Sequence, residues 1–459
     1  MTSMPSGIVG ASGGRPQTEQ HEQPFARIRT TQIGAHVGVR IRLAGWLQAR
    51  RRLGAITFLV VRDGWGTAQA MAATAEEVAP LDVAGAGVES VVSVEGEVTE
   101  APQAPGGVEL RDLRIKVISA VSVAPPVTIN KRDLKASLAT QLDAAVVANR
   151  HVSRRAVFRL SAAAMRGFRE TLLARDFTEI QSPKLVAAAT ESGASVFAVD
   201  YFDRRAYLAQ SPQFYKQIMV GVFERVFEVG PVFRAEPHDT TRHLNEYVSL
   251  DMECGFIRDH QDVMALLRDT LAGMLARMQT DCAAELALLG VTLPDVPPII
   301  PQIDFVAAQE VIFRRHAVDV RGEPDLSAQD ERWLGAWAQE QYGSDWLYVT
   351  GYPLAGRAFY TAPDPARPAQ SNAFDLLLRG TELVSGGQRL HRYEDYVATL
   401  AARGLPLEPF TDYLDAFRYG MPPHGGFGLG LERLLMQLLG LPNIKLASLF
   451  PRDLTRLTP

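Results

Sequence analysis

Residues 233–256, FRAEPHDTTRHLNEYVSLDMECGF, carry the pattern on which the interpretation of this sequence depends. From Tyr247 to Phe256 polar and apolar side chains alternate, which predicts a β-strand with one face toward the core. The apolar face comprises Val248, Leu250, Met252, Cys254 and Phe256, and the polar face comprises Tyr247, Ser249, Asp251 and Glu253. We therefore expect a half-buried strand that carries two acids on its polar side.

Charged side chains precede this strand at a strand end and in a turn-rich loop; they are Arg234, Glu236, His238, Arg242 and His243. Guanidinium groups bind phosphate bidentately, and the acids can select an amine or a base edge. The hairpin therefore suits an anionic, metal-bridged substrate such as a nucleotide. A hairpin that only carries salt bridges is the alternative, because charged strand faces are common.

A second cluster lies in residues 374–391, FDLLLRGTELVSGGQRLH. Glu382 and Ser385 are three residues apart before a predicted Gly-Gly turn, and Arg389 follows. A carboxylate and a hydroxyl at this spacing can hold Mg²⁺, with water and phosphate oxygens completing the coordination shell. An ordinary strand and turn is the alternative.

A third cluster, residues 420–433, reads GMPPHGGFGLGLER and leads into a predicted helix over residues 431–439. Glycines near a helix start let the backbone approach a phosphate or a base, and Arg433 adds a positive charge. The segment matches neither a Walker A loop nor a Rossmann fingerprint. By itself it predicts a glycine-rich turn.

A fourth cluster, residues 207–217, reads YLAQSPQFYKQ. Gln213 and Lys216 are spaced to share one face of a short helix. Lys216 is the only lysine between Lys184 and Lys445, and an isolated lysine of this kind is usually a solvated charge.

Composition excludes several classes of protein. The chain has 459 residues, and its formal net charge of -5 argues against indiscriminate coating of nucleic acid. It lacks an apolar run of about 18 residues and a signal-like N-terminus, so a spanning helix and secretion are not expected. Cys254 and Cys282 fit neither a disulfide framework nor a paired-cysteine metal site. We expect a reduced, cytoplasmic protein with no membrane association.

The chain divides into a flexible tail (1–25), a small barrel or sandwich (26–124), a linker (125–155) and a large α+β domain (156–459). Strands are expected over 39–46, 55–62, 88–98, 107–117, 177–180, 346–350 and 374–384. One helix should present Val157, Leu160, Ala164, Met165, Phe168 and Leu172 on one face. A second should bury Val263, Leu267, Leu271, Met274, Leu275 and Met278. Irregular alternation of helices and strands favours an antiparallel sheet.

Within the barrel, the basic run Arg50–Arg52 precedes a strand that bears Phe58. Basic side chains beside an aromatic platform suit single-stranded nucleic acid. A solvated arginine loop and a core phenylalanine explain the same residues equally well.

Taken together and in this order, the motifs resemble those of class II aminoacyl-tRNA synthetases, with Pro183 in the place of the motif 1 proline at the dimer interface. SPQFYKQ, FRAEPHDTTRHLNEY, SGGQRLH, YGMPPHGGFGLGLER and the final FPRDLTRLTP are similar to the archaeal-type aspartyl-tRNA synthetases over about residues 28–459. The resemblance implies an N-terminal OB-fold β-barrel for the anticodon and a catalytic domain with an antiparallel sheet flanked by helices. It also implies a homodimer that uses ATP, Mg²⁺, L-aspartate and tRNA(Asp).

Carried over by position, the resemblance makes Arg234 the catalytic residue, at the ATP α-phosphate and the substrate carboxylate. Other ATP-binding positions are Glu236, Arg242, His243, Leu244, Glu382, Gly430 and Arg433. Glu382 and Ser385 would hold Mg²⁺. Lys216 and Arg389 would clamp the aspartate side chain, and Ser385 would also lie at the aspartate. The ammonium group would be received by Glu191, Gln213 and Asp251.

Two cations opposite the β-carboxylate disfavour a neutral amide, because one charge would stay unpaired. The asparaginyl-tRNA synthetases share most of these residues but typically lack the lysine at Lys216, so aspartate is favoured over asparagine. A synthetase-like paralogue that no longer charges tRNA is the remaining alternative. Departures from the family pattern are Arg52, Ser192 and Pro237.

For the anticodon, the resemblance implies roles for Arg51, Phe58 and Gln69. Family members that discriminate between tRNA(Asp) and tRNA(Asn) tend to carry tryptophan at Gln48 and lysine at Pro105. Pro105 favours relaxed specificity, and Gln48 fits neither group. We therefore predict that tRNA(Asn) is also a substrate.

Overall fold

The structure, a computed structural model, describes residues 25–187 and 196–458 in two compact units. The first unit extends to Asn130 and the second begins at Lys131. The expected N-terminal tail lies outside the described residues except for Phe25. No described helix is long and apolar enough to cross a membrane.

The described part of the first unit, residues 25–130, forms a closed barrel. Its strands are hydrogen-bonded in the order β1-β2-β3-β5-β4. Alternate side chains such as Leu43, Leu59 and Val94 fill its interior. β3 was not predicted, because its sequence TAQAMA is rich in alanine and has only one β-branched residue. The basic run Arg50–Arg52 belongs to β1. The elements are β1 (Arg40–Leu53), β2 (Ile56–Arg62), β3 (Thr67–Ala72), α1 (Ala75–Val83), β4 (Val91–Glu100) and β5 (Val108–Ser119).

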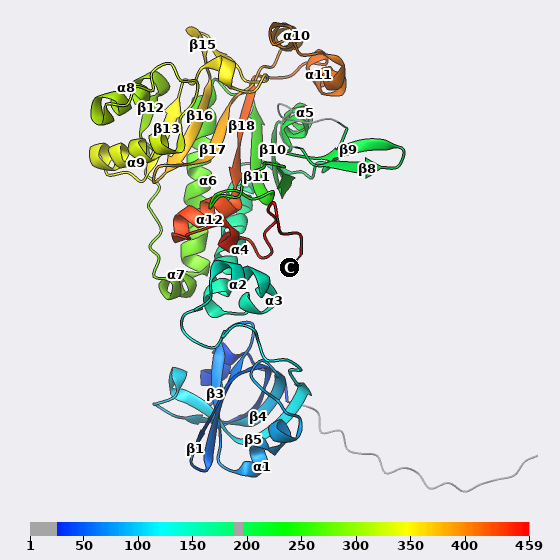
Figure 1. Ribbon diagram of the computed structural model, residues 1–459, viewed down its shortest axis with the longest axis vertical. Helices are drawn as coiled ribbons and strands as arrows, with labels where there is room; N and C mark the ends of the chain where they lie inside the picture. The colour runs from blue at the N-terminus through cyan, green and yellow to red at the C-terminus, as the bar shows by residue number, and fades with distance from the viewer. Residues whose placement is uncertain (1–24, 188–195, 459) are drawn as a thin grey trace, which may run out of the picture. The chain divides into compact units, whose positions relative to one another are not determined.

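The second unit is built on a sheet of eight described strands (Figure 1). Neighbouring strands are antiparallel, as expected, except for the two edge pairs β12–β13 and β10–β6. In spatial order the strands are β12 (Gln302–Asp304), β13 (Trp346–Thr350), β16 (Ala373–Leu378), β17 (Thr381–Gln388), β18 (His424–Gly430), β11 (Glu246–Gly255), β10 (Arg225–Phe233) and β6 (Thr178–Glu179).

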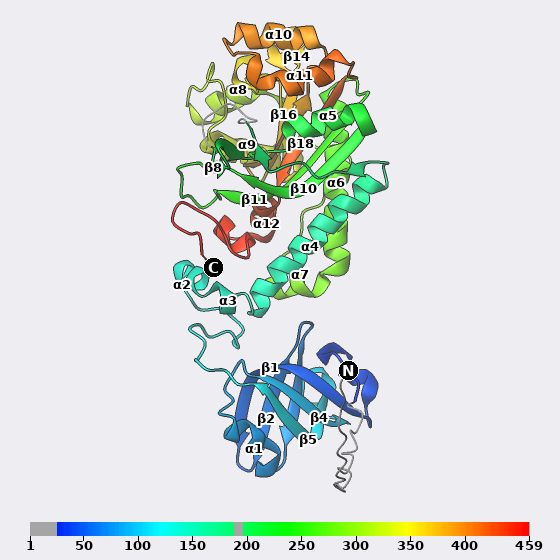
Figure 2. The same ribbon diagram turned by 90° about the vertical axis from the view of Figure 1, so that its right-hand side faces the viewer.

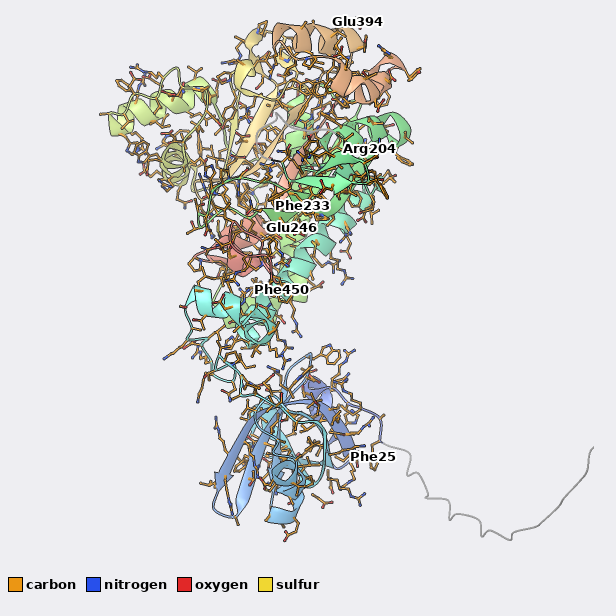
Figure 3. The ribbon with its side chains drawn as sticks, turned by 45° about the vertical axis from the view of Figure 1, so that its right-hand side comes forward. Phe25, Arg204, Phe233, Glu246, Glu394 and Phe450 are labelled. Atoms are coloured by element: carbon orange, nitrogen blue, oxygen red, sulfur yellow. The ribbon has the colours of Figure 1, made fainter. Side chains whose placement is uncertain are left out.

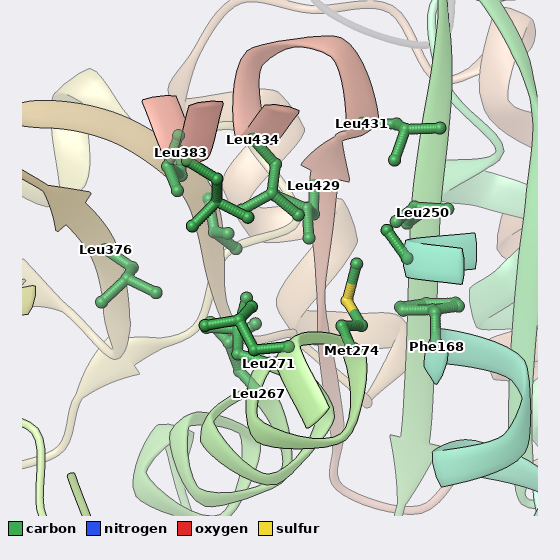
Figure 4. Packing of buried hydrophobic residues seen from close by; sticks show 14 of the residues in the cluster. Phe168, Leu250, Leu267, Leu271, Met274, Leu376, Leu383, Leu429, Leu431 and Leu434 are labelled. Carbon is green, nitrogen blue, oxygen red and sulfur yellow. The ribbon is translucent and has the colours of Figure 1, made fainter. Parts of the chain in front are cut away.

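One face of this sheet is covered by α4 (Val152–Leu173), α6 (His260–Asp281) and α12 (Leu431–Leu439) (Figures 2 and 4). The expected stripes on the first two helices are confirmed, and only Met165 is partly exposed. The helices approach closely at Gly167, where a Cβ atom would lie 2.7 Å from the Met274 Cα atom. Apolar burial on this face leaves the opposite face of the sheet available for polar groups.

Both glycine-rich segments that were predicted as turns are central strands, so these two expectations are wrong. Gly386 and Gly387 lie in β17, and 424–430 forms β18. The turn lies instead at Arg379 and Gly380, whose φ angles are 49° and 73°. The single strand expected over 374–384 is therefore the hairpin of β16 and β17.

The expected apolar face of β11 holds for Leu250, Met252 and Cys254, which are buried, but not for Phe256. Phe256 lies beyond the strand end, has a φ of 59° and is 72 % exposed. Its left-handed backbone breaks the alternation, and the side chain turns away from the core.

The remaining elements surround the sheet. α5, α10 and α11 share a cluster of aromatic side chains, and α2 and α3 form within the range expected as a linker. These elements are α2 (Leu138–Asp143), α3 (Ala145–Ala148), β7 (Leu185–Val186), β8 (Ala198–Tyr201), β9 (Arg204–Leu208), α5 (Gln213–Phe223), α7 (Ala283–Leu289), α8 (Phe305–His316), α9 (Ala328–Tyr342), β14 (Pro363–Asp364), β15 (Arg367–Ser371), α10 (Tyr393–Ala402) and α11 (Thr411–Arg418).

Candidate functional site

A row of polar positions crosses the sheet on the face opposite the helices. Strand register places Asp375 beside Ser385, Ser385 beside Gly428, and Gly428 beside Asp251. Adjacent positions in such a row point to the same side of a sheet. The row therefore runs across four strands, from an acid on β16 to an acid on β11.

β18 lies in the middle of this row and carries glycine at every second position. Gly426, Gly428 and Gly430 face the polar side, opposite Glu253, Asp251 and Ser249. Phe427 and Leu429 point into the core and are fully buried. The missing side chains leave a hollow between β17 and β11, and a Cβ atom at Gly428 would come within 3.1 Å of Asp251 Oδ1.

Two buried cations lie at the base of this hollow. Lys216, on α5, is 1 % exposed, and its Nζ atom lies 3.0 Å from Asp251 Oδ1 and 3.4 Å from Glu253 Oε2. Arg389, which follows β17, has its Nε atom 2.9 Å from Glu253 Oε1. Glu253, two residues beyond Asp251 on β11, thus contacts both cations.

Burial alone would raise the pKa of Glu253, because it penalises the charged form. The nearby charges of Arg389 and Lys216 outweigh that effect and hold the pKa below its ordinary value. Glu253 is therefore held in its charged form at a buried position between Arg389 and Lys216. The expected half-buried strand is buried on both faces, since Ser249, Asp251 and Glu253 are all below 8 % exposed.

A second group of acids lies at the other end of the row. Ser385 Oγ donates to Asp375 Oδ1 at 2.6 Å and lies 3.1 Å from Glu382 Oε1. Arg357 binds Asp375 bidentately, at 3.1 and 2.7 Å. Burial, together with the negative charge of Asp375, raises the pKa of Glu382 to about 7.

This arrangement of hard oxygen donors fits a small divalent cation. A cation would relieve the repulsion between Glu382 and Asp375 and restore the charged form of Glu382. The described residues contain no group of three or more His, Cys, Asp or Glu side chains able to hold a metal ion. A cation at Glu382 and Ser385 would therefore need oxygens from a phosphate and water, which is the usual binding mode of Mg²⁺.

The loop between β10 and β11 covers one side of the hollow, and Figure 3 labels the strand residues at its two ends, Phe233 and Glu246. Arg234 begins the loop, and its backbone N–H donates to the Asn245 carbonyl oxygen at 2.9 Å. The Arg234 guanidinium lies 5.9 Å from the centroid of the Tyr247 ring. These contacts hold Arg234 at the edge of the hollow.

The C-terminal segment contacts the middle of this loop. Lys445 Nζ lies 2.8 Å from Asp239 Oδ1, on the loop, and 2.7 Å from Asp453 Oδ2. The Ile444 N–H also donates to the Thr241 carbonyl oxygen. Residues 444–453 therefore tether the loop through an ion pair and a backbone hydrogen bond.

One cavity collects most of the residues predicted from the sequence. Those that line it are Gln213, Arg234, Glu236, Arg242, His243, Leu244, Asp251, Glu382, Ser385, Arg389, Gly430 and Arg433. Lys216 lies beneath the floor and reaches the cavity through Asp251. The Gln213 side chain is 5 % exposed, and its Nε2 has no hydrogen-bond partner in the described part of the chain. Glu191 lies outside the described residues.

The barrel presents a separate candidate site on the outer face of β1, β2 and β3. Phe58 is half-buried, outside the barrel core, and pairs with Arg51 and Met71 on the neighbouring strands. Gln69, also half-buried, donates through Nε2 to Glu109 at 2.9 Å. The alternative that Phe58 belongs to the barrel core is wrong. Leu59 points into the core, so the neighbouring Phe58 points to the outer face.

Gln48 and Pro105 lie in irregular segments of the barrel. Gln48 sits at a bulge in β1, and its carbonyl oxygen accepts from Asn130 Nδ2 at 3.0 Å. Pro105 is exposed in the connection between β4 and β5.

Comparison with known proteins places this geometry in a family. Residues 137–454 match the model of class II tRNA synthetases (D, K and N), and residues 41–118 match that of an OB-fold nucleic-acid-binding domain. The chain belongs to the class II tRNA synthetases. The resemblance found in the sequence is thereby confirmed, together with the α+β catalytic unit and the OB-fold barrel.

Three relatives of this class II synthetase are informative. Aspartate–tRNA(Asp/Asn) ligase of Thermus thermophilus is 48 % identical over 433 residues, covering 94 % of this chain and all of the relative. The enzyme of the same name from Deinococcus radiodurans is 45 % identical over 441 residues, covering 95 % and 99 %. The crystal structure of asparaginyl-tRNA synthetase from Pyrococcus horikoshii with asparaginyl-adenylate has a TM-score of 0.87 at 32 % identity, covering 95 % of this chain and 100 % of that one.

Among the contributors to the synthetase site that were not recognised in the sequence are Asp375, its partner Arg357, and Glu253 as the partner of both cations. Asp375 lies directly opposite Ser385, so a correct hairpin prediction would have found it. Glu253 was placed with Asp251 among the acids that could select an amine or a base edge, but its contact with the two cations was not predicted. The alternation GFGLG in 426–430 is itself a strand signal of period two.

Proposed function

We propose that this class II synthetase ligates L-aspartate to tRNA through an aspartyl-adenylate. The observation that carries the proposal is the pair of buried cations, Lys216 and Arg389, at the base of a cavity that also contains Arg234 and the Glu382–Ser385 pair. The names of the Thermus and Deinococcus relatives support the same reaction.

The proposed reaction has two steps. An oxygen of the aspartate α-carboxylate attacks the α-phosphorus of ATP, and pyrophosphate leaves. The terminal ribose hydroxyl of tRNA then attacks the carbonyl carbon of the adenylate, and AMP leaves. The protein contributes positioning and charge stabilisation, which are the main sources of rate enhancement in reactions of this kind.

Roles follow from position in the cavity. Arg234 would bind the α-phosphate and the α-carboxylate and stabilise the pentavalent transition state. Glu382 and Ser385 would hold Mg²⁺, which neutralises phosphate charge when bound. The nucleotide would lie between the 234–245 loop and the start of α12, at Glu236, Arg242, His243, Leu244, Gly430 and Arg433.

The aspartate side chain would lie above the base of the cavity. Lys216 and Arg389 would oppose its carboxylate, and Gln213 and Asp251 would receive the ammonium group together with Glu191. Ser385 would lie beside the bound aspartate. A neutral amide in the same place could not balance the charge of the second cation. Asparagine would therefore bind more weakly than aspartate.

On the barrel, Phe58 would stack on an anticodon base, while Arg51 and Gln69 would contact neighbouring nucleotides. We propose tRNA(Asp) as a substrate and tRNA(Asn) as a second one, which Pro105 and the names of the relatives support. We also propose that the enzyme works in the cytoplasm as a homodimer, with the segment around Pro183 at the interface.

Pyrophosphate exchange into ATP, measured with aspartate or asparagine, tests the amino acid. Exchange with aspartate alone supports the proposal, whereas exchange with asparagine alone would make the chain an asparaginyl-tRNA synthetase. Absence of exchange with either would favour a paralogue that does not charge tRNA. Charging of purified tRNA(Asn) with aspartate then tests relaxed tRNA specificity.

A further inference from the structure

A buried group of hydrogen-bonded side chains, which we call the tyrosine cluster, consists of Gln217, Tyr396, Tyr413 and His424. All four are below 5 % exposed. Gln217 Oε1 lies 2.8 Å from the Tyr413 hydroxyl oxygen, 3.0 Å from that of Tyr396 and 3.2 Å from His424 Nε2. The two hydroxyl oxygens are 2.8 Å apart. Groups from α5, α10, α11 and β18 therefore meet at one amide.

The surroundings of the tyrosine cluster are aromatic and apolar. Phe214 stacks on the Tyr413 ring with centroids 4.2 Å apart, and Phe417 packs against Tyr396 at 4.3 Å. Phenylalanine in place of either tyrosine would pack the same rings without burying a hydroxyl group. Because buried polar groups stabilise a fold little and cost free energy when unpaired, the hydroxyls call for a role other than packing.

The tyrosine cluster holds the backbone around Arg389, one of the two buried cations. The Tyr396 hydroxyl donates to the Leu390 carbonyl oxygen at 3.0 Å, and Leu390 follows Arg389 in sequence. The Arg389 N–H donates to the His424 carbonyl oxygen at 2.9 Å. The backbone N–H of Arg389 and the carbonyl group of the next residue are thus both hydrogen-bonded to members of the cluster.

The second cation is held through α5. Gln217 follows Lys216 on that helix, so the contact of Gln217 with the two tyrosines fixes the rotation and depth of Lys216. Lys216 Nζ and Arg389 Nε both contact Glu253, at 3.4 and 2.9 Å. The tyrosine cluster therefore links the two backbone segments whose side chains converge on one carboxylate.

We propose that the Tyr396 and Tyr413 hydroxyls are positioning groups that set the spacing between Lys216 and Arg389, and with it the preference for aspartate over asparagine. A carboxylate satisfies two cations only at a defined separation, whereas an amide gains little from the second cation. A small displacement therefore penalises the acid more than the amide. This inference rests on the function proposed above.

The test replaces both tyrosines, Tyr396→Phe and Tyr413→Phe, singly and together in the full-length chain. We expect the double variant to raise the KM for aspartate about tenfold and to lower the aspartate-to-asparagine ratio of kcat/KM about tenfold in pyrophosphate exchange. The KM for ATP should stay unchanged. The ratio does not depend on the fraction of folded enzyme, and the single variants decide the matter if the double variant does not fold.

Tyr348→Phe is the matched control. Its buried hydroxyl donates to the Met264 carbonyl oxygen at 3.0 Å, on the helix-covered side of the sheet. It should change the thermal unfolding midpoint to a similar degree and leave the KM for aspartate and the ratio unaltered. Cluster variants that behave like this control, or that lower kcat equally for both amino acids, would overturn the positioning role. A wild-type chain without aspartate-dependent exchange would instead overturn the proposed function, and the inference with it.

Discussion

The cavity of the catalytic unit and the outer face of the barrel differ in how their candidate binding residues are held. In the cavity, Lys216 and Arg389 are at most 6 % exposed, and buried acids hold both cations in place. On the barrel, Phe58 and Gln69 are half-buried and Arg51 is exposed. A small charged ligand is selected by charges fixed before it arrives, whereas bases of a flexible strand can be met by side chains that remain accessible.

The largest effect should come from filling the glycine strand. In Gly426→Ala the new Cβ would collide with the Met252 carbonyl oxygen and the Glu253 carboxylate. We expect a loss of about 2–3 kcal/mol in the free energy of unfolding, because backbone in the middle of the sheet cannot move aside. Chemical denaturation measures this loss.

The barrel offers a matched control for that substitution. A Cβ atom at Gly34 would meet no atom within 4 Å, so Gly34→Ala should change stability by less than about 0.5 kcal/mol. Equal losses at the two positions would contradict the difference in space around Gly426 and Gly34.

An intermediate effect is expected on the barrel face. Phe58→Ala should weaken tRNA binding by about 1–3 kcal/mol, the usual contribution of one stacked base. Pyrophosphate exchange without tRNA should stay at the wild-type level, since the catalytic cavity is untouched. Trp65→Ala, which removes an aromatic ring packed on Arg29 elsewhere in the barrel, is the control for loss of an exposed ring. Unchanged tRNA affinity in Phe58→Ala would exclude this face.

The smallest of the three effects concerns the tether of the 234–245 loop. Lys445→Met removes the ion pairs with Asp239 and Asp453, and we expect the KM for ATP to rise about tenfold, which corresponds to ~1.4 kcal/mol. The KM for aspartate should change little. Arg456→Met removes the nearby ion pair with Asp143, which does not reach the loop, and should leave both constants unaltered. A rise in both variants would point to a general loss of structure instead.

The sequence predicted the two long helices with strong apolar periodicity and missed two strands that are rich in glycine or alanine. The stripes of α4 and α6 were found because large apolar side chains recur at helical spacing. β3 and β18 were missed because alanine and glycine have little intrinsic preference for strands, and the period-two alternation GFGLG in β18 was not recognised. Pairing with β11 and β17 on its two sides stabilises 424–430 as a strand.

The candidate site was predicted largely through the family resemblance, since each motif alone had an ordinary structural explanation. What the residues could not indicate is which charges meet across the fold. Glu253 and Arg389 are 136 positions apart in sequence, and Asp375 reaches Ser385 only through a hairpin that was taken for one strand. Contacts of this kind depend on register, which single-strand patterns do not specify.

The central claim is that paired buried cations select the acid over its amide, and competition between aspartate and asparagine in pyrophosphate exchange tests it most directly. For Arg389→Gln the account predicts that the ratio of kcat/KM for aspartate to that for asparagine falls by about 100-fold or more, because one partner of the carboxylate is lost. A ratio equal to that of the wild-type enzyme would contradict it.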